Sequence, residues 1–212
     1  MSELIPRGTD CLVLVDLQYD FMPGGALAVA GGDTLVPVAN RLAERFAHVV
    51  VTQDWHPAGH SSFASQHPGH APFESVEMTY GAQTLWPDHC VQGTAGAELH
   101  RDLALDRADL ILRKGHRSGI DSYSAFMEND HATPTGLAGF LRERGFRRLF
   151  FAGLATDFCV AWSVQDARKA GFEAVILTDA CRAIDLGGSL DAAMADMRAA
   201  GAVVAETASV LD

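Results

Sequence analysis

Six short, mainly apolar runs recur along the chain, and each ends at a polar residue or at glycine. The runs lie at residues 11–15, 49–52, 110–112, 149–152, 174–177 and 203–205. The first of them, CLVLV, is apolar at every position, which is typical of a strand buried on both faces of a sheet. We therefore expect six strands in the interior of the protein.

Segments with helical signals separate these runs. Four helices are expected, at residues 34–47, 135–144, 159–170 and 189–201. Asp33, Thr135 and Ser189 have side chains suited to capping three of the helix starts. Strands that alternate with helices predict an α/β protein, in which a parallel sheet carries helices on both faces as in Rossmann and flavodoxin-like layering. We expect residues 1–212 to form a single domain, because this length fits one sizeable core.

Two long segments have neither pattern. Residues 56–98 are rich in His, Pro, Gly and Ser, and we expect them to be mostly loop. A second polar loop is expected at residues 116–134. Long loops inside a compact domain are usually functional, so these segments are candidates for building a site.

Composition and charge exclude several classes of protein. The formal net charge is −11, which argues against a nucleic-acid partner because phosphate binding needs a basic face. No apolar run is long enough to span a bilayer, and the N-terminal segment MSELIPRGTD has no signal-peptide pattern. Four cysteines are scattered without C-x-x-C spacing, so we expect free thiols and a cytoplasmic protein.

Ionisable residues follow four of the expected strands. Asp16 ends the first, Asp54 and His56 follow the second, Lys114 follows the third, and Cys159 comes shortly after the fourth. Each of these residues taken alone could be a turn residue or a solvated strand end. Ligands bind beyond the carboxyl ends of the strands in parallel sheets, and these residues all fall on that edge. The joint pattern predicts a functional site there.

Cys159 has surroundings that suit a nucleophile. The segment Arg148–Val160 reads as a buried strand, a tight turn at Gly153 and a helix start near the cysteine. A helix N-terminus lowers a thiol pKa, and its free N–H groups can hold an oxyanion. Lys114 supplies a cation for a thiolate, and Asp16 supplies a carboxylate that can take the thiol proton. The alternative is a small buried cysteine that only packs.

A metal site is expected from three other residues. Asp54 and His56, two apart after a strand, can point at one ion, and His89 is a third candidate. Such a set suits Zn²⁺, Fe²⁺ or Mn²⁺. His60 is a possible fourth ligand, and Cys90 competes with its neighbour His89 as the ligand in that segment. The alternative is that these histidines only form hydrogen bonds within the loop.

Aromatic residues lie in the loops close to these positions. They are Phe21, Trp55, Trp86, Tyr123 and Phe158. They could stack on a flat ligand ring, or they could form the small satellite core that a long loop needs.

Seven motifs occur along the chain in one order. They are VDLQYDF, GGALAV, VVTQDWHP, LWPDHCVQGTAG, RKG, DSYSAF and GLATDFCV. On these motifs the chain resembles the nicotinamidases (pyrazinamidases) of the isochorismatase-like cysteine hydrolase family. The resemblance covers nearly the whole chain, and the GLATDFCV and WPDHCVQGT matches are its most specific parts. One departure is Phe158, since some members have histidine before the nucleophile.

The resemblance implies a set of site residues. The implied catalytic triad is Asp16, Lys114 and Cys159, and the implied metal ligands are Asp54, His56 and His89. The resemblance also implies a cis peptide between Leu154 and Ala155 and an oxyanion hole made by the backbone N–H groups of Ala155 and Cys159. Residues implied to enclose the substrate ring are Phe21, Trp86, Tyr123 and Ala155. The loop around His60 differs in length from that of members with a fourth ligand.

The resemblance also implies an activity. It is the hydrolysis of nicotinamide to nicotinate and ammonia through a cysteine thioester, with one divalent metal ion (Zn, Fe or Mn), feeding NAD salvage. Nicotinamide is the implied partner, and a homo-oligomer is possible. The alternative is another cysteine amidase or carbamoyl hydrolase that needs no metal. A nucleotide-binding module has no support, because neither a G-x-G-x-x-G nor a P-loop motif occurs.

Overall fold

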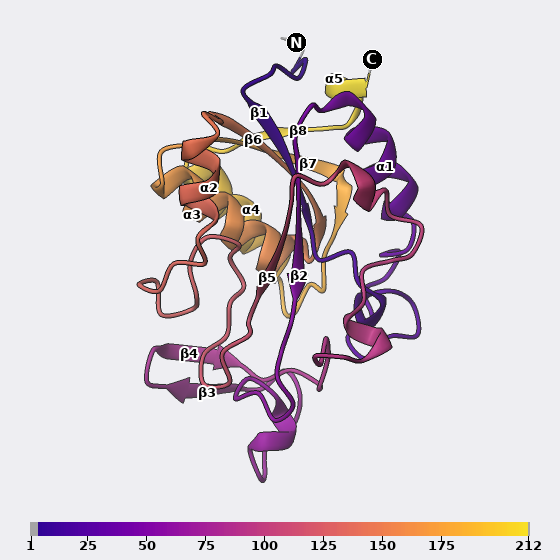
Figure 1. Ribbon diagram of the computed structural model, residues 1–212. Coiled ribbons are helices and arrows are strands. Elements are labelled where there is room, and N and C mark those ends of the chain that lie inside the picture. Colours follow the sequence, from indigo (N-terminus) through magenta and orange to yellow (C-terminus); the bar gives the residue numbers. More distant parts are fainter. Residues whose placement is uncertain (1–3, 212) are drawn as a thin grey trace.

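The computed structural model describes residues 4–211, and a six-stranded parallel sheet forms its centre (Figure 1). The strand order across the sheet is β5-β2-β1-β6-β7-β8. The strands are β1 (Asp10–Val15), β2 (Val49–Asp54), β5 (Leu110–Lys114), β6 (Arg148–Leu154), β7 (Glu173–Arg182) and β8 (Val203–Ala205). A separate antiparallel hairpin consists of β3 (Ser75–Met78) and β4 (Gly81–Thr84).

Helices cover both faces of the sheet, which confirms the α/β prediction. The α-helices are α1 (Leu35–Arg45), α2 (Leu137–Glu143), α3 (Ala161–Lys169), α4 (Ser189–Ala199) and α5 (Ala208–Leu211). In Figure 1, α1 and α5 lie on one side of the sheet, and α2, α3 and α4 lie on the other. Short 3₁₀ segments occur at Tyr19–Phe21, Ala64–Gln66, Ala95–Ala97 and Leu105–Arg107, and a π-helical turn, η5, spans Thr156–Val160. Within residues 4–211, none of the helices has the length and apolarity that crossing a bilayer requires.

The central strands are buried because both of their faces are covered. Every residue of β1 and β2 is buried, and β6 is buried from Leu149 onwards. The edge strand β5 is less protected, and its Ile111 is 43% exposed. Removing each Val, Leu or Ile side chain of the central strands from water contributes about 1.5–3 kcal/mol to folding. The core therefore lies along β1, β2 and β6, the strands whose ends carry Asp16 and Asp54 and lead to Cys159.

The strand order reverses between β1 and β6, and this reversal opens a crevice at the carboxyl edge of the sheet. β1 and β6 pair in register up to Val15 and Gly153. A Cβ on Gly153 would lie 2.1 Å from Val15 O, so only glycine permits this approach. On the other side, Asp54 at the end of β2 pairs with Lys114 at the end of β5. The ends of four strands therefore converge on one place.

Several helix starts differ from the sequence prediction. The residue before α1 is Thr34 and not Asp33, and the residues before α2 and α4 are Gly136 and Gly188. Thr135 still serves the start of α2, since its Oγ1 accepts a hydrogen bond from Leu137 N at 3.2 Å. Gly136 and Gly188 have positive φ and set the direction of the chain into α2 and α4. Polar capping residues in the sequence give no sign of these glycine starts.

Two further elements differ in detail from the sequence prediction. The helix expected to begin at Cys159 begins three residues earlier, at Thr156, as the π-helical turn η5. Residues 56–98 are mostly loop, as expected, but they also contain the hairpin of β3 and β4, which the sequence did not predict. Its strands have four residues each and are only partly buried, so they lack the apolar pattern of the central strands.

Candidate active site

The strand ends bring Asp16, Lys114 and Cys159 into direct contact. Lys114 Nζ lies 2.8 Å from Asp16 Oδ2 and 3.4 Å from Cys159 Sγ. It also donates to Ser122 O at 3.0 Å. All three members are buried. The arrangement places a cation between a carboxylate and a thiol, as the sequence predicted.

Thr52 on the neighbouring strand β2 holds Asp16 in place. Its φ is +50°, a left-handed conformation that aspartate tolerates better than most residues. Thr52 Oγ1 donates to Asp16 Oδ1 at 2.6 Å and accepts from Asp16 N at 3.2 Å. Oδ2 faces Lys114 and accepts no well-aligned hydrogen bond within the described residues. That oxygen is therefore the one available for a proton from Cys159.

Two carboxylates share Lys114, and their environments drive their pKa values apart. Asp54 Oδ1 lies 2.5 Å from Lys114 Nζ. Burial would raise the pKa of Asp54, but Lys114 and His56 outweigh it and hold this pKa well below its usual range. Burial raises the pKa of Asp16, and Lys114 offsets this only in part. Of the two neighbouring carboxylates, Asp16 is therefore the one that binds a proton more readily.

The structure corrects the pKa direction that the sequence predicted for Cys159. The position of Cys159 at a helix start predicts a lowered thiol pKa. Instead, burial raises the pKa of Cys159 well above its ordinary value, Lys114 lowers it, and Asp16 and Asp54 raise it again. The helix dipole and one shared lysine do not outweigh this degree of burial. These surroundings favour the protonated thiol over the thiolate.

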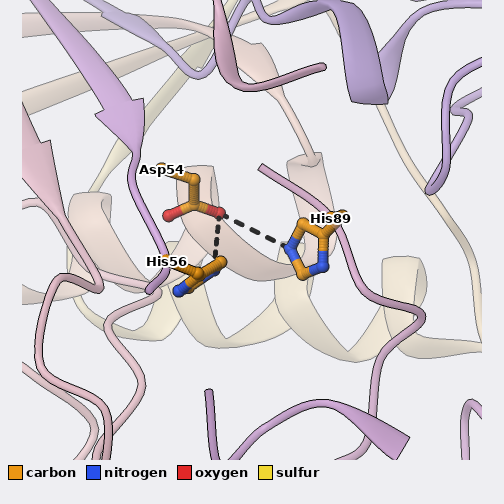
Figure 2. Close-up of side chains that lie close together, drawn as sticks. All are labelled: Asp54, His56 and His89. Carbon is orange, nitrogen blue, oxygen red and sulfur yellow. Dashed lines mark ion pairs between the residues drawn. The ribbon is translucent and has the colours of Figure 1, made fainter. Parts of the chain in front are cut away.

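Asp54, His56 and His89 converge on a second point beside the triad (Figure 2). Asp54 Oδ2 lies 3.7 Å from His56 Nε2 and 3.9 Å from His89 Nε2. The other ring nitrogens donate to carbonyls: His56 Nδ1 to Gly115 O at 2.9 Å and His89 Nδ1 to Pro87 O at 2.8 Å. Carbonyl partners of this kind fix the tautomer that leaves Nε2 free for a metal. This group could therefore hold a metal ion.

The surroundings of His89 fit the same interpretation. Burial, with a smaller effect of His56, lowers the pKa of His89 to about 4, so its ring is neutral at neutral pH. A neutral imidazole is the form that binds metals. Gly115, the last residue of the RKG motif, makes room for the His56 ring. A Cβ at this position would lie 2.5 Å from His56 Cε1.

His60 and Cys90 do not join this group. His60 Nδ1 contacts Ser62 Oγ at 2.8 Å, and Nε2 contacts Ile120 O at 3.1 Å, so both ring nitrogens are already used. In the Pro87–Cys90 segment, His89 and not Cys90 belongs to the group with Asp54. Burial raises the pKa of Cys90 well above its ordinary value, which disfavours the thiolate that a metal would need.

Gln18 is a site residue that the sequence did not reveal. Its side chain is fully buried and brackets the peptide of Asp54: Oε1 accepts from Asp54 N at 2.7 Å, and Nε2 donates to Asp54 O at 2.8 Å. Nε2 also donates to Ala97 O at 2.9 Å. Asp54 contacts Lys114 with one oxygen and faces the histidines with the other, so Gln18 positions the residue that links both centres. The VDLQ motif alone gave no sign of these distant partners.

A pocket opens onto both centres. Its lining residues are Phe21, Leu27, Asp54, His56, Trp86, His89, Asp121, Tyr123, Ala155, Phe158, Cys159 and Ile184. The Trp86 and Phe158 rings meet edge to face with centroids 4.8 Å apart, and Tyr123 Oη accepts a hydrogen bond from Trp86 Nε1 at 3.0 Å. Four of the five loop aromatics considered above thus line one pocket. Trp55 does not, and Arg113 lies over its ring at 3.9 Å.

Ala155 and Cys159 border the pocket at the end of β6. The Leu154–Ala155 peptide is cis, as the resemblance implied. Ala155 O accepts hydrogen bonds from Phe158 N and Val160 N, both at 3.1 Å, on either side of Cys159. Behind the turn, Asp157 accepts from Ile184 N at 3.1 Å and so fixes the wall residue Ile184. Leu27, Asp121 and Ile184 were not predicted as lining residues, although the first two lie in the GGALAV and DSYSAF motifs.

Comparisons with known proteins show what this chain is similar to. The family model of the isochorismatase domain matches residues 10–209. A nicotinamidase of Acinetobacter baylyi is 54% identical over 203 residues, which cover 95% of this chain and 95% of that protein.

Solved structures are similar as well. A nicotinamidase pyrazinamidase of Acinetobacter baumanii is 53% identical with a TM-score of 0.94, covering 95% of this chain and 98% of that one. PnC1 of L. infantum in complex with nicotinate is 42% identical with a TM-score of 0.84, covering 96% and 95%. A pyrazinamidase of Pyrococcus horikoshii in complex with zinc is 35% identical with a TM-score of 0.75, covering 93% and 99%.

Proposed function

This chain belongs to the isochorismatase domain family, and we infer that it is an amidohydrolase that converts nicotinamide to nicotinate and ammonia. The observation that carries this inference is the single aromatic pocket that exposes both Cys159 and the Asp54, His56 and His89 group. A flat pyridine carboxamide has two ends, and the pocket offers a nucleophile for one and metal ligands for the other. The reaction supplies nicotinate to NAD salvage.

In the first half of the proposed reaction, Cys159 attacks the carboxamide carbon. Asp16 Oδ2 takes the thiol proton as the sulfur–carbon bond forms. Lys114, at 3.4 Å from Sγ, stabilises the developing thiolate. The backbone N–H groups of Ala155 and Cys159 hold the oxyanion. Asp16 then returns its proton to the leaving nitrogen, the carbon–nitrogen bond breaks, and ammonia departs from a thioester.

In the second half, water hydrolyses the thioester. Asp16 takes a proton from the water as it attacks the acyl carbon, and the proton returns to Cys159 Sγ when the sulfur–carbon bond breaks. Phe21, Trp86 and Tyr123 hold the ring against the nucleophile throughout, which keeps the reacting atoms in a productive geometry.

One divalent metal ion, Zn, Fe or Mn, is the proposed cofactor, held by Asp54, His56 and His89. When bound, it supplies a Lewis-acidic anchor for the ring nitrogen of the substrate. His60 would take no part, because both of its ring nitrogens already contact other polar atoms. We place the protein in the cytoplasm, since four free thiols suit a reducing compartment.

Removing the metal is the experiment that tests the proposed function. Chelation should reduce ammonia release from nicotinamide strongly, because the ring is then no longer anchored against Cys159. Benzamide, which lacks the ring nitrogen, should be a poor substrate with or without metal. Ammonia release and metal content are measured on the same preparations.

The rival interpretation is a cysteine amidase that needs no metal. It predicts full turnover of nicotinamide by a metal-free preparation, or comparable rates on benzamide and nicotinamide. Either result would mean that Asp54, His56 and His89 have only a structural role.

Changing Gln18 to glutamate should weaken metal binding by about 10- to 100-fold, the usual effect of disturbing a group that orients a ligand. The carboxylate would still accept from Asp54 N, but it would face the carbonyls of Asp54 and Ala97 without a proton to donate. Gln53→Glu is the matched control, since Gln53 Nε2 donates to Ala97 O at 2.8 Å and does not bracket Asp54. Titration with a competing chelator measures both affinities, and equal affinities would contradict the role of Gln18.

A further inference from the structure

Asp121 is a buried carboxylate that the proposed reaction does not use. It is 2% exposed and lines the pocket together with Cys159. One of its oxygens lies within 4.8 Å of ring nitrogens of His56 and His60. Within the part of the chain that the structure describes, no lysine or arginine pairs with it. A buried carboxylate without a cationic partner is costly, so its position calls for an explanation.

The hydrogen bonds to Asp121 all come from neutral N–H groups. Ser122 N donates to Oδ1 at 2.7 Å, and Gln83 Nε2 donates to Oδ2 at 3.1 Å. Its carbonyl accepts from Asn129 N at 2.8 Å, which fixes the backbone. Because these donors are neutral, they bring no positive charge that would offset the carboxylate.

The charges around the pocket show what this carboxylate changes. Asp16 and Asp54 both contact Lys114, so one cation already serves two carboxylates. Asp121 adds a third negative charge on the pocket wall. With a divalent ion on Asp54, Asp121 would offset part of the positive charge of the lysine and the ion. Without Asp121, the same pocket would be more positive and would attract anions more strongly.

We propose that Asp121 is a specificity-determining residue that makes the pocket favour the neutral carboxamide over the anionic carboxylate product. This proposal rests on the proposed function, in which nicotinamide enters neutral and nicotinate leaves as an anion on the same ring. The Asp121 charge repels the new carboxylate and has little effect on the uncharged amide. Product release is thereby favoured without weakening substrate binding to the same extent.

Three variants separate the effect of the Asp121 charge from the effect of disturbing its hydrogen bonds. Asp121→Asn removes the charge but leaves one N–H donor without an acceptor, so it also disturbs local hydrogen bonds. Asp121→Glu keeps the charge and disturbs the same contacts. Asp88→Asn removes a charge next to His89 but outside the pocket, where Asp88 accepts from Ser65 Oγ at 2.6 Å. Nicotinate dissociation constants are measured by calorimetry on the metal-loaded proteins, with KM for nicotinamide measured in parallel.

We expect Asp121→Asn to bind nicotinate about three- to tenfold more tightly than the unmodified protein, the size expected for one unit charge several ångströms away. Asp121→Glu and Asp88→Asn should bind nicotinate no more tightly than the unmodified protein. Structural damage alone would weaken binding in both Asp121 variants, so tighter binding in only one of them identifies the charge. Unchanged or weaker nicotinate binding by Asp121→Asn would overturn the proposal. If the unmodified protein released no ammonia from nicotinamide, the proposed function itself would be wrong. That result is distinct from an unchanged nicotinate affinity, which would overturn only the role of Asp121.

Discussion

Replacing Cys159 with alanine should lower ammonia release from nicotinamide by at least about 10⁴-fold, because no other group in the described pocket can form the thioester. The fold should persist. Cys159 borders a pocket, and its sulfur contributes about as much burial as one methylene, about 0.8 kcal/mol. Turnover is measured by ammonia release, and unfolding by thermal denaturation followed by circular dichroism.

The matched control is Cys181→Ala, which removes a buried thiol at the end of β7 that does not line the pocket. It should retain most of the activity. If Cys159→Ala kept more than a small fraction of the activity of the unmodified protein, attack by this sulfur would be excluded.

Replacing Lys114 with methionine should remove activity and also destabilise the protein by about 3–5 kcal/mol, the cost of breaking a buried ion pair from one side. Asp16 and Asp54 would then lie close together without the cation that separates their charges. Since Lys114 lowers the pKa of Cys159, its loss should raise that pKa further above its already elevated value. Iodoacetamide should then alkylate Cys159 only at higher pH.

The pH dependence of alkylation decides the role of this lysine. An upward shift in Lys114→Met supports its action on the thiol. An unshifted alkylation profile in a folded Lys114→Met protein would reduce Lys114 to a purely structural ion-pair partner. Arg113→Met is the control, because Arg113 lies one residue away on β5 and packs on Trp55 outside the pocket.

The sheet and the catalytic edge could be predicted because they depend on local patterns. Apolar runs mark buried strands, and parallel strands carry their carboxyl ends to one edge. Asp16, Asp54, Lys114 and Cys159 each follow a run, so the rule for parallel sheets placed them together before any contact was known. The residue types then indicated the chemistry.

Other features depend on long-range packing that no local pattern records. The pKa of Cys159 is raised because loops from distant segments close over it, and the helix start alone predicted the opposite direction. Gln18 acts on Asp54 and Ala97, far away in the sequence. The β3–β4 hairpin that delivers Gln83 to Asp121 is short and half-exposed, so its strands resembled loop. The cis peptide before Ala155 was implied only by the family resemblance.

A single-turnover experiment detects the proposed thioester on Cys159 itself. Enzyme in excess over nicotinamide is quenched in acid at successive times, digested, and analysed by mass spectrometry. The peptide carrying Cys159 should gain one nicotinoyl group that rises as ammonia is released and falls as nicotinate appears. If ammonia and nicotinate appear together while the Cys159 peptide stays unmodified at every time point, water attacks the amide directly and the account is wrong.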